Sequence, residues 1–216
     1  MGQPLRCESW RYRPFSAGWL MGSMIGSSLI DDWVGMREGF VGGYRFGWDF
    51  DHYWGCEVQF GLASMGLYDS DRAKQAQEAA DALLNLAVDD PYLTRFEQRR
   101  DADVGLWDVH FLYYPWGDAT WRPYGSIGLG SMHIRFMDRL SNRHSKSFLG
   151  LPLALGVKYR CNNWLALRAE VSDNMAFGGG PGFNALHNLS ITGGMEVRFG
   201  GRRTVYWPYS PGRHYW

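Results

Sequence analysis

The sequence predicts an all-β fold, an eight-stranded antiparallel up-and-down transmembrane barrel with one helical extracellular loop. Three observations lead to it: period-two alternation in eight segments, links that alternate between short and long, and aromatic residues near the segment ends. The composition agrees, since 28 of 216 residues are glycine and 16% are aromatic. The 22 basic and 22 acidic residues cancel, so no net charge points to nucleic acid as a partner.

The last segment has the clearest pattern. From His187 to Phe199, apolar residues alternate strictly with polar or small residues. A strand of this length exceeds the usual soluble strand of about 5–6 residues. It suits a tilted strand that crosses a bilayer, which needs about 9–11 residues.

Seven earlier segments are interpreted as strands in the same way. In chain order they are Gly18–Ser27, Gly39–Asp49, Trp54–Tyr68, Val104–Tyr114, Tyr124–Phe136, Phe148–Arg160 and Trp164–Ser172. The first and the fifth alternate less cleanly. In the fifth, Arg135 shares a face with Ile127 and Leu129, so polar and apolar positions are mixed.

The links between these strands predict the topology. The short links are 48–53, 115–120 and 161–163, and the long ones are 29–38, 69–103, 138–147 and 178–186. Short turns at one end and long loops at the other are typical of barrels in an outer membrane. The longest link contains a predicted amphipathic helix over about 71–87, because alanine and leucine recur there at helical spacing.

Alternation alone does not say whether the apolar face points to lipid or to a core, since a soluble lipocalin-like barrel alternates too. Rings near both strand ends favour the membrane barrel, whose interfaces carry aromatic girdles. Glycine and alanine crowd the opposite face of several strands, which leaves room inside a narrow barrel for long charged side chains. We expect a periplasmic tail at 1–15, the barrel at 16–200 and an aromatic periplasmic tail at 201–216.

Two hairpins resemble a known family. Residues 40–46 (FVGGYRF) with 54–61 (WGCEVQFG) look like the second hairpin of OmpA-like outer-membrane barrels, and 164–171 with 188–194 resemble the last hairpin of small bacterial outer-membrane β-barrel proteins. Residues 194–199 (GMEVRF) are similar to the family's last-strand assembly signal, carried here by Gly194, Val197 and Phe199. That signal usually ends the chain or precedes a folded domain, whereas 200–216 follow it here.

The resemblance implies a location in the bacterial outer membrane and assembly by the barrel insertion machinery. It also implies contact with outer-membrane lipid and lipopolysaccharide. No signal peptide is recognisable at the start, and this location implies that one has been removed. The basic segment 142–146 is either a solvated loop or a contact for lipopolysaccharide phosphates.

The polar faces predict a charged lumen. Eight strands enclose a space just wide enough for side chains to fill, and charges there must pair because an unpaired charge in a water-poor lumen is costly. The predicted lumen charge network comprises Arg45, Asp49, Glu57, Asp108, Arg135, Lys158, Arg168, Glu170, Glu196 and Arg198. A paired network fills the pore, so we expect a structural, anchoring or scaffold role, with a narrow channel for small solutes as the alternative.

A rim enzyme that modifies lipid is the third hypothesis. Ser172, with His187 and His133, supplies its candidate residues, but the deacylase pattern places a histidine where this chain has Glu170. We therefore expect no catalytic residue, no metal and no cofactor. Cys7, Cys56 and Cys161 lack metal-ligand spacing. All three map to the periplasmic end, where a disulfide from Cys7 to one of the others is a further hypothesis.

Both tails are dense in aromatic residues. Trp10–Phe15 precede the barrel, and the predicted docking residues after it are Tyr206, Trp207, Tyr209, Arg213, Tyr215 and Trp216. Proline, arginine and rings in such density suit a segment that docks on a surface. We expect the tails either to cover the periplasmic mouth or to bind a periplasmic protein or a cell-wall component.

Overall fold

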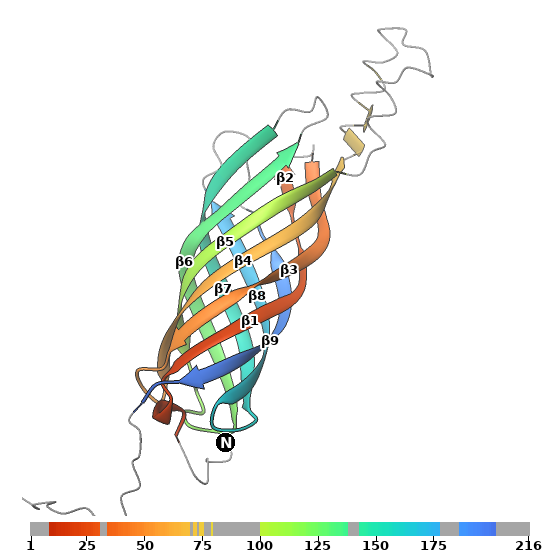
Figure 1. Cartoon of the computed structure of the whole chain (residues 1–216). Coiled ribbons are helices and arrows are strands. Elements are labelled where there is room, and N and C mark those ends of the chain that lie inside the picture. Colours follow the sequence, from red (N-terminus) through yellow and green to blue (C-terminus); the bar gives the residue numbers. More distant parts are fainter. Residues whose placement is uncertain are drawn as a thin grey trace, which may run out of the picture.

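The computed structural model describes residues 9–30, 34–69, 71–72, 74–75, 79, 100–137, 143–177 and 186–201. Within them, a short 3-10 helix η1 (Trp10–Tyr12) precedes one sheet rolled into a tall barrel of tilted strands (Figure 1). The strands are β1 (Phe15–Ile25), β2 (Ser28–Ile30), β3 (Val34–Trp48), β4 (Trp54–Asp69), β5 (Arg100–Tyr113), β6 (Trp121–Met137), β7 (Arg143–Arg160), β8 (Leu165–Phe177) and β9 (Leu189–Phe199).

The sheet closes on itself. From β2 to β9, strands that follow one another in the chain pair antiparallel, and β1 pairs with both β3 and β9. The short β2 resumes the course of β1 after an interruption and pairs with β3. The prediction of an eight-stranded up-and-down barrel is therefore confirmed. Closure leaves no open sheet edge whose backbone N–H and C=O groups would lack hydrogen-bond partners in lipid.

Several strands extend beyond their predicted ends. β3, β5 and β7 begin at Val34, Arg100 and Arg143, four or five residues earlier than expected from alternation. The added residues of β5 and β7 are mostly polar on both faces, so the ladder of hydrogen bonds continues where the alternation has disappeared. Of the helix expected over 71–87, the described residues 71–72, 74–75 and 79 are helical, and the others lie outside the described residues.

The two ends of the barrel differ. One end, here called the turn end, holds the short links 49–53, 114–120 and 161–164 together with the start of β1 and the finish of β9. In the second of these links Gly117 has a φ of 56°, a left-handed conformation that glycine adopts at little cost. The opposite end, called the loop end, is where the long links join the strands.

The outer face of the barrel is apolar. Leu62 and Leu155 are 75% and 73% exposed, and exposed rings recur on every side. Around the turn end the rings pack against one another across neighbouring strands, with centroids 6.3 Å apart for Phe15 and Trp48 and 4.6 Å apart for Trp121 and Tyr159. An apolar exterior of this extent suits lipid rather than water, and the packed rings form the aromatic girdle.

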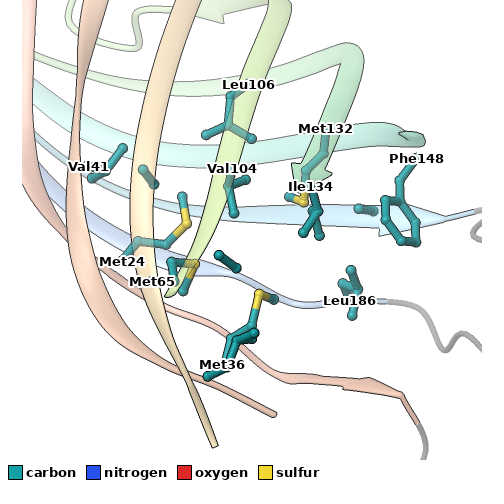
Figure 2. Close-up of a cluster of buried hydrophobic side chains, with 14 of the residues drawn as sticks. Met24, Met36, Val41, Met65, Val104, Leu106, Met132, Ile134, Phe148 and Leu186 are labelled. Atoms are coloured by element: carbon teal, nitrogen blue, oxygen red, sulfur yellow. The ribbon is translucent and has the colours of Figure 1, made fainter. Parts of the chain in front are cut away.

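The interior consists of two layers. The half nearer the turn end contains charged side chains, whereas the half nearer the loop end is filled by an apolar cluster. Figure 2 shows side chains from many strands pointing toward one another there. The cluster comprises Leu20, Met24, Met36, Val41, Ala63, Met65, Leu67, Ala102, Val104, Leu106, Met132, Ile134, Phe148, Ala176 and Leu186. The expectation of a polar lumen therefore holds for one half of the barrel only.

Candidate functional site: a filled lumen with a closed mouth

Arg168 of β8 is the centre of the charged layer. Its Nη1 lies 2.5 Å from Glu57 Oε2 and 3.0 Å from Glu196 Oε1, and its Nη2 lies 2.6 Å from Glu170 Oε2. These three carboxylates come from three different strands. The guanidinium also donates through Nε to the hydroxyl of Tyr124. A single guanidinium thus links four strands across the lumen, because its planar group presents several N–H donors in fixed directions.

Two further cations complete this layer. Arg45 of β3 donates to both carboxylate oxygens of Glu170, at 2.5 and 3.2 Å, and through Nε to Gln59. Lys158 of β7 lies 2.9 Å from Glu196. Most partners of Arg168 therefore have a second cation nearby. Glu57 is the exception, because Arg45 and Lys158 approach it only to 3.5 and 3.9 Å.

A second cluster lies closer to the turn end, around Asp49. Arg122 and Arg198 both reach its Oδ2, at 2.7 and 2.6 Å, and the hydroxyl of Tyr114 donates to Oδ1. Burial acts against the charged form of Asp49, but the two guanidinium groups outweigh it and hold the pKa of this carboxyl well below its ordinary value. Asp49 is therefore ionised at any physiological pH.

Trp10 closes the mouth beneath this cluster. The side chain is fully buried, and its indole Nε1 donates to the carbonyl of Ala119 at 2.7 Å. Three guanidinium groups surround the ring, with centroid distances of 5.2 Å for Arg122, 5.6 Å for Arg160 and 4.7 Å for Arg198. Arg198 also donates to the backbone carbonyl of Trp10. Cation–π contacts in a desolvated position are favourable, so η1 is fixed as a cap on the turn end.

The predicted network residues differ in their placement. Nine are buried in the lumen, namely Arg45, Asp49, Glu57, Asp108, Lys158, Arg168, Glu170, Glu196 and Arg198. Asp108 lies apart from the ion pairs, and its Oδ2 has no hydrogen-bond partner within the described structure. The assignment of Arg135 to the lumen was wrong. Its side chain is exposed on the outer face, because Met132 and Ile134 occupy the inner positions of that part of β6.

Several network members were missed from the sequence. Arg122 precedes the predicted start of its strand, although it shares its inner face with Tyr124 two residues later. Extending the alternation of β6 toward the N-terminus, past Pro123, would have placed Arg122 on the inner face. Tyr114 is the last residue of its predicted strand and lies just beyond the end of β5, where it continues the inner face of Asp108. Trp10 lies outside the strands, where no periodicity applies.

The serine and histidine of the rim-enzyme hypothesis do not meet. Ser172 points into the lumen, with its hydroxyl 2.6 Å from that of Ser190. His187 is exposed and pairs with Asp173 at 3.0 Å. Their side chains thus lie on opposite sides of the barrel wall, and this pair offers no nucleophile with an adjacent base.

The remaining predicted sites have these positions. Val197 and Phe199 face outward on β9, and Phe199 stacks on Phe15. A Cβ on Gly194 would collide with the backbone carbonyl of Trp19, so the close approach of β1 requires glycine here. Recognition of these three residues by the insertion machinery stays a prediction.

The thiols and the C-terminal tail are only partly described. Cys56 and Cys161 are free thiols. Cys7 and the docking residues of 202–216 lie outside the described residues. Within the ranges that the structure covers, no group of three or more His, Cys, Asp or Glu side chains is arranged to hold a metal ion. The described helical residues include no helix long and apolar enough to cross a membrane.

Comparison with solved structures identifies similar barrels. Neisserial surface protein A (NspA) aligns with a TM-score of 0.58 and 14% identity, covering 86% of this chain and 97% of its own. OprG from Pseudomonas aeruginosa aligns with a TM-score of 0.51 and 15% identity, covering 90% and 100%. The attachment invasion locus protein Ail of Yersinia pestis aligns with a TM-score of 0.50 and 12% identity, covering 86% and 99%. At these identities the likeness concerns the fold.

The sequence itself matches a family model. No curated protein sequence gives a significant match. The model of the outer membrane protein beta-barrel domain matches residues 14–199, which is the span from just before β1 to the last residue of β9. Its match places the barrel in the bacterial outer membrane. The chain therefore belongs to the outer membrane protein beta-barrel domain family.

Proposed function

We propose that this protein is a structural or anchoring barrel of the outer membrane with a permanently filled lumen, and that it neither conducts solutes nor catalyses a reaction. The observation that carries the proposal is the pairing of the charged layer around Arg168. Its contact with Glu57 of β4 at 2.5 Å bridges the lumen. Its contacts with Glu170 on its own strand and with Glu196 on the neighbouring β9, at 2.6 and 3.0 Å, fill the space beside that bridge and leave little room for an ion to pass.

The apolar layer supports the same proposal. Met24, Met65, Met132 and Ile134 are at most 1% exposed and point to the barrel axis near the loop end (Figure 2). A hydrophobic constriction opposes conduction by excluding water. An ion that crosses this barrel has to pass the apolar layer first and then break paired charges.

Trp10 adds a third obstacle at the turn end. Its burial under three arginines, and its hydrogen bond to Ala119, close the mouth with the chain's own N-terminal segment. Short turns of such barrels face the periplasm, so this cap lies on the periplasmic side.

Conductance across a planar bilayer tests the proposal. Purified barrel, shown to be folded by heat-modifiable gel migration, is expected to give no current steps, whereas a general porin inserted under the same conditions gives them. Discrete ohmic steps from the wild-type protein would support the narrow channel instead. Mass spectrometry of lipid A from expressing cells tests the non-enzymatic part, since an altered acyl pattern would contradict it.

A further inference from the structure

The outer face of β6 carries a charged side chain at Arg135, beyond a run of apolar residues. On β6 the exposed side chains run from Trp121 through Leu129 to Arg135. At about 3.3 Å per residue and a strand tilt of about 40°, Arg135 stands about 35 Å above the girdle residue Trp121. The apolar band of such barrels is about 25 Å tall. Arg135 therefore lies among the lipid headgroups of the loop-end leaflet.

A groove runs down from this level on the outer wall. It has a volume of about 850 Å³ and crosses β1, β3, β4, β5 and β6. A second hollow of about 550 Å³ shares Phe40, Leu62, Gly105, His133 and Arg135 with it. The two hollows therefore form one continuous groove, which is open to lipid.

Two glycines lie in the floor of the groove. One row of paired residues across the wall reads Met21, Gly42, Leu62, Gly105 and His133. Gly105 leaves a gap on one side of Leu62, and on the other side the ring of Phe40 lies against Gly42. The next row toward the turn end consists of large side chains, Trp19, Tyr44, Phe60 and Trp107. The result is a shallow trough with an apolar aromatic lower wall.

The upper end of the groove is polar, and its lining includes Arg135 and Asp103. The ring of His133 is held by two serines of β7, with Nδ1 2.9 Å from Ser147 Oγ and Nε2 3.0 Å from Ser145 Oγ. Arg135 is exposed beside them. Among the described residues it has no hydrogen bond or ion pair, although Asp103 is its cross-strand neighbour. A guanidinium at headgroup level with free donors suits a phosphate, which it binds bidentately.

We propose that this groove binds lipid A of the outer leaflet, with a phosphate on Arg135 and acyl chain along the glycine floor. The charge and the level together select this occupant. The loop end faces outside in barrels of this topology, and the phosphorylated lipid of that leaflet is lipopolysaccharide. The site uses the outer wall alone, so it stands independently of whether the lumen conducts.

Native mass spectrometry of the full chain in detergent micelles, titrated with purified lipid A, tests the assignment. Arg135→Gln removes the phosphate contact and is expected to weaken lipid A binding about tenfold. Gly105→Leu fills the trough and is expected to weaken it similarly. A Cβ at Gly105 meets nothing closer than 3.8 Å, so the change fits the backbone. Asp103→Asn removes a repulsive carboxylate and is expected to strengthen binding.

The matched control is Gly125→Leu. Gly125 also faces lipid, in a hollow of about 590 Å³ that no basic side chain lines, and a Cβ there has 3.6 Å to its nearest neighbour. We expect this variant to bind like the wild type. Dephosphorylated lipid A and phosphatidylethanolamine are expected to bind at least tenfold more weakly, and inorganic phosphate is expected not to compete. Equal affinity of wild type, Arg135→Gln and Gly105→Leu, or equal binding of the three lipids, would overturn the proposal. Heat-modifiable migration shows which variants are folded.

Discussion

Replacing Arg168 by methionine is expected to lower the stability of the barrel strongly. Most of this loss of stability should come from one of the three carboxylates, which loses its only close cation. Methionine keeps much of the side-chain length but removes the guanidinium. Glu170 then still has Arg45 at 2.5 Å, and Glu196 still has Lys158 at 2.9 Å. Glu57 has no cation closer than 3.5 Å left.

The magnitude follows from the burial of these groups. Removing one partner of a buried ion pair costs about 3–5 kcal/mol, because the other charge stays buried and uncompensated. Glu57 is 2% exposed, so we expect Arg168→Met to lower the free energy of unfolding by about 3–5 kcal/mol. Neutralising the abandoned carboxylate in the double variant Arg168→Met/Glu57→Gln should restore a large part of that loss.

A second double variant makes the prediction specific. Arg168→Met/Glu196→Gln leaves Glu57 with only the longer contacts to Arg45 and Lys158, at 3.5 and 3.9 Å. It also removes the nearer partner of Lys158, so it should be no more stable than Arg168→Met alone. Urea unfolding of the barrel in lipid vesicles, followed by heat-modifiable migration, gives the four free energies. A cost below about 1 kcal/mol for the single variant, typical of an exposed pair, would refute the reasoning. Equal stability of the two double variants would refute it as well.

The other predictions concern the mouth. Trp10→Ala should lower the free energy of unfolding by about 3 kcal/mol in urea titrations, as other buried tryptophans do. Trp116→Ala, which removes a ring 48% exposed at the same end, should change it by about 0.5 kcal/mol or less. Because the folded pKa of Asp49 is depressed, its contribution is present above the unfolded pKa of about 3.9 and is lost as the pH falls below that value. Unfolding free energies measured between pH 6 and 3 should thus fall less for Asp49→Asn than for the wild type, and parallel curves would contradict this. Cys161 is exposed in a turn. In a chain whose other thiols are replaced by serine, it should react with an impermeant maleimide only after the outer membrane is permeabilised. Labelling of Cys161 in intact cells would show that the turn end faces outside instead.

Alternation was sufficient to predict the strands and their order, because it reports directly on two-faced strands. It does not report how an inner face changes along its length. On β4 the same face carries Glu57 and Gln59 near the turn end and then Ala63 and Met65 near the loop end, so the apolar layer was not foreseen. Arg135 was misplaced for a related reason. Outward residues beyond the apolar band are polar too, and charge alone then indicates the wrong face.

The pairing of the lumen charges was beyond prediction from the sequence. Glu170 and Glu196 lie on the strand of Arg168 and on its neighbour, but Glu57 belongs to β4, whose distance from β8 across the lumen depends on barrel closure. Covering of the mouth by a tail was one of the two expectations, but the partners of Trp10 were not predictable, because they are the carbonyl of Ala119 and arginines of three strands. No local pattern encodes such a contact.

The lumen contacts also have a consequence for biogenesis. Arg45 and Glu170 are 125 positions apart in the chain, Arg168 and Glu57 are 111 apart, and Asp49 and Arg198 are 149 apart. None of these pairs exists until the late strands have joined the early ones. A chain arrested before β9 lacks Glu196 and Arg198, so it holds cations and carboxylates without their partners. The side chains inside the lumen therefore stabilise the completed barrel and contribute little to an intermediate that lacks the last strand.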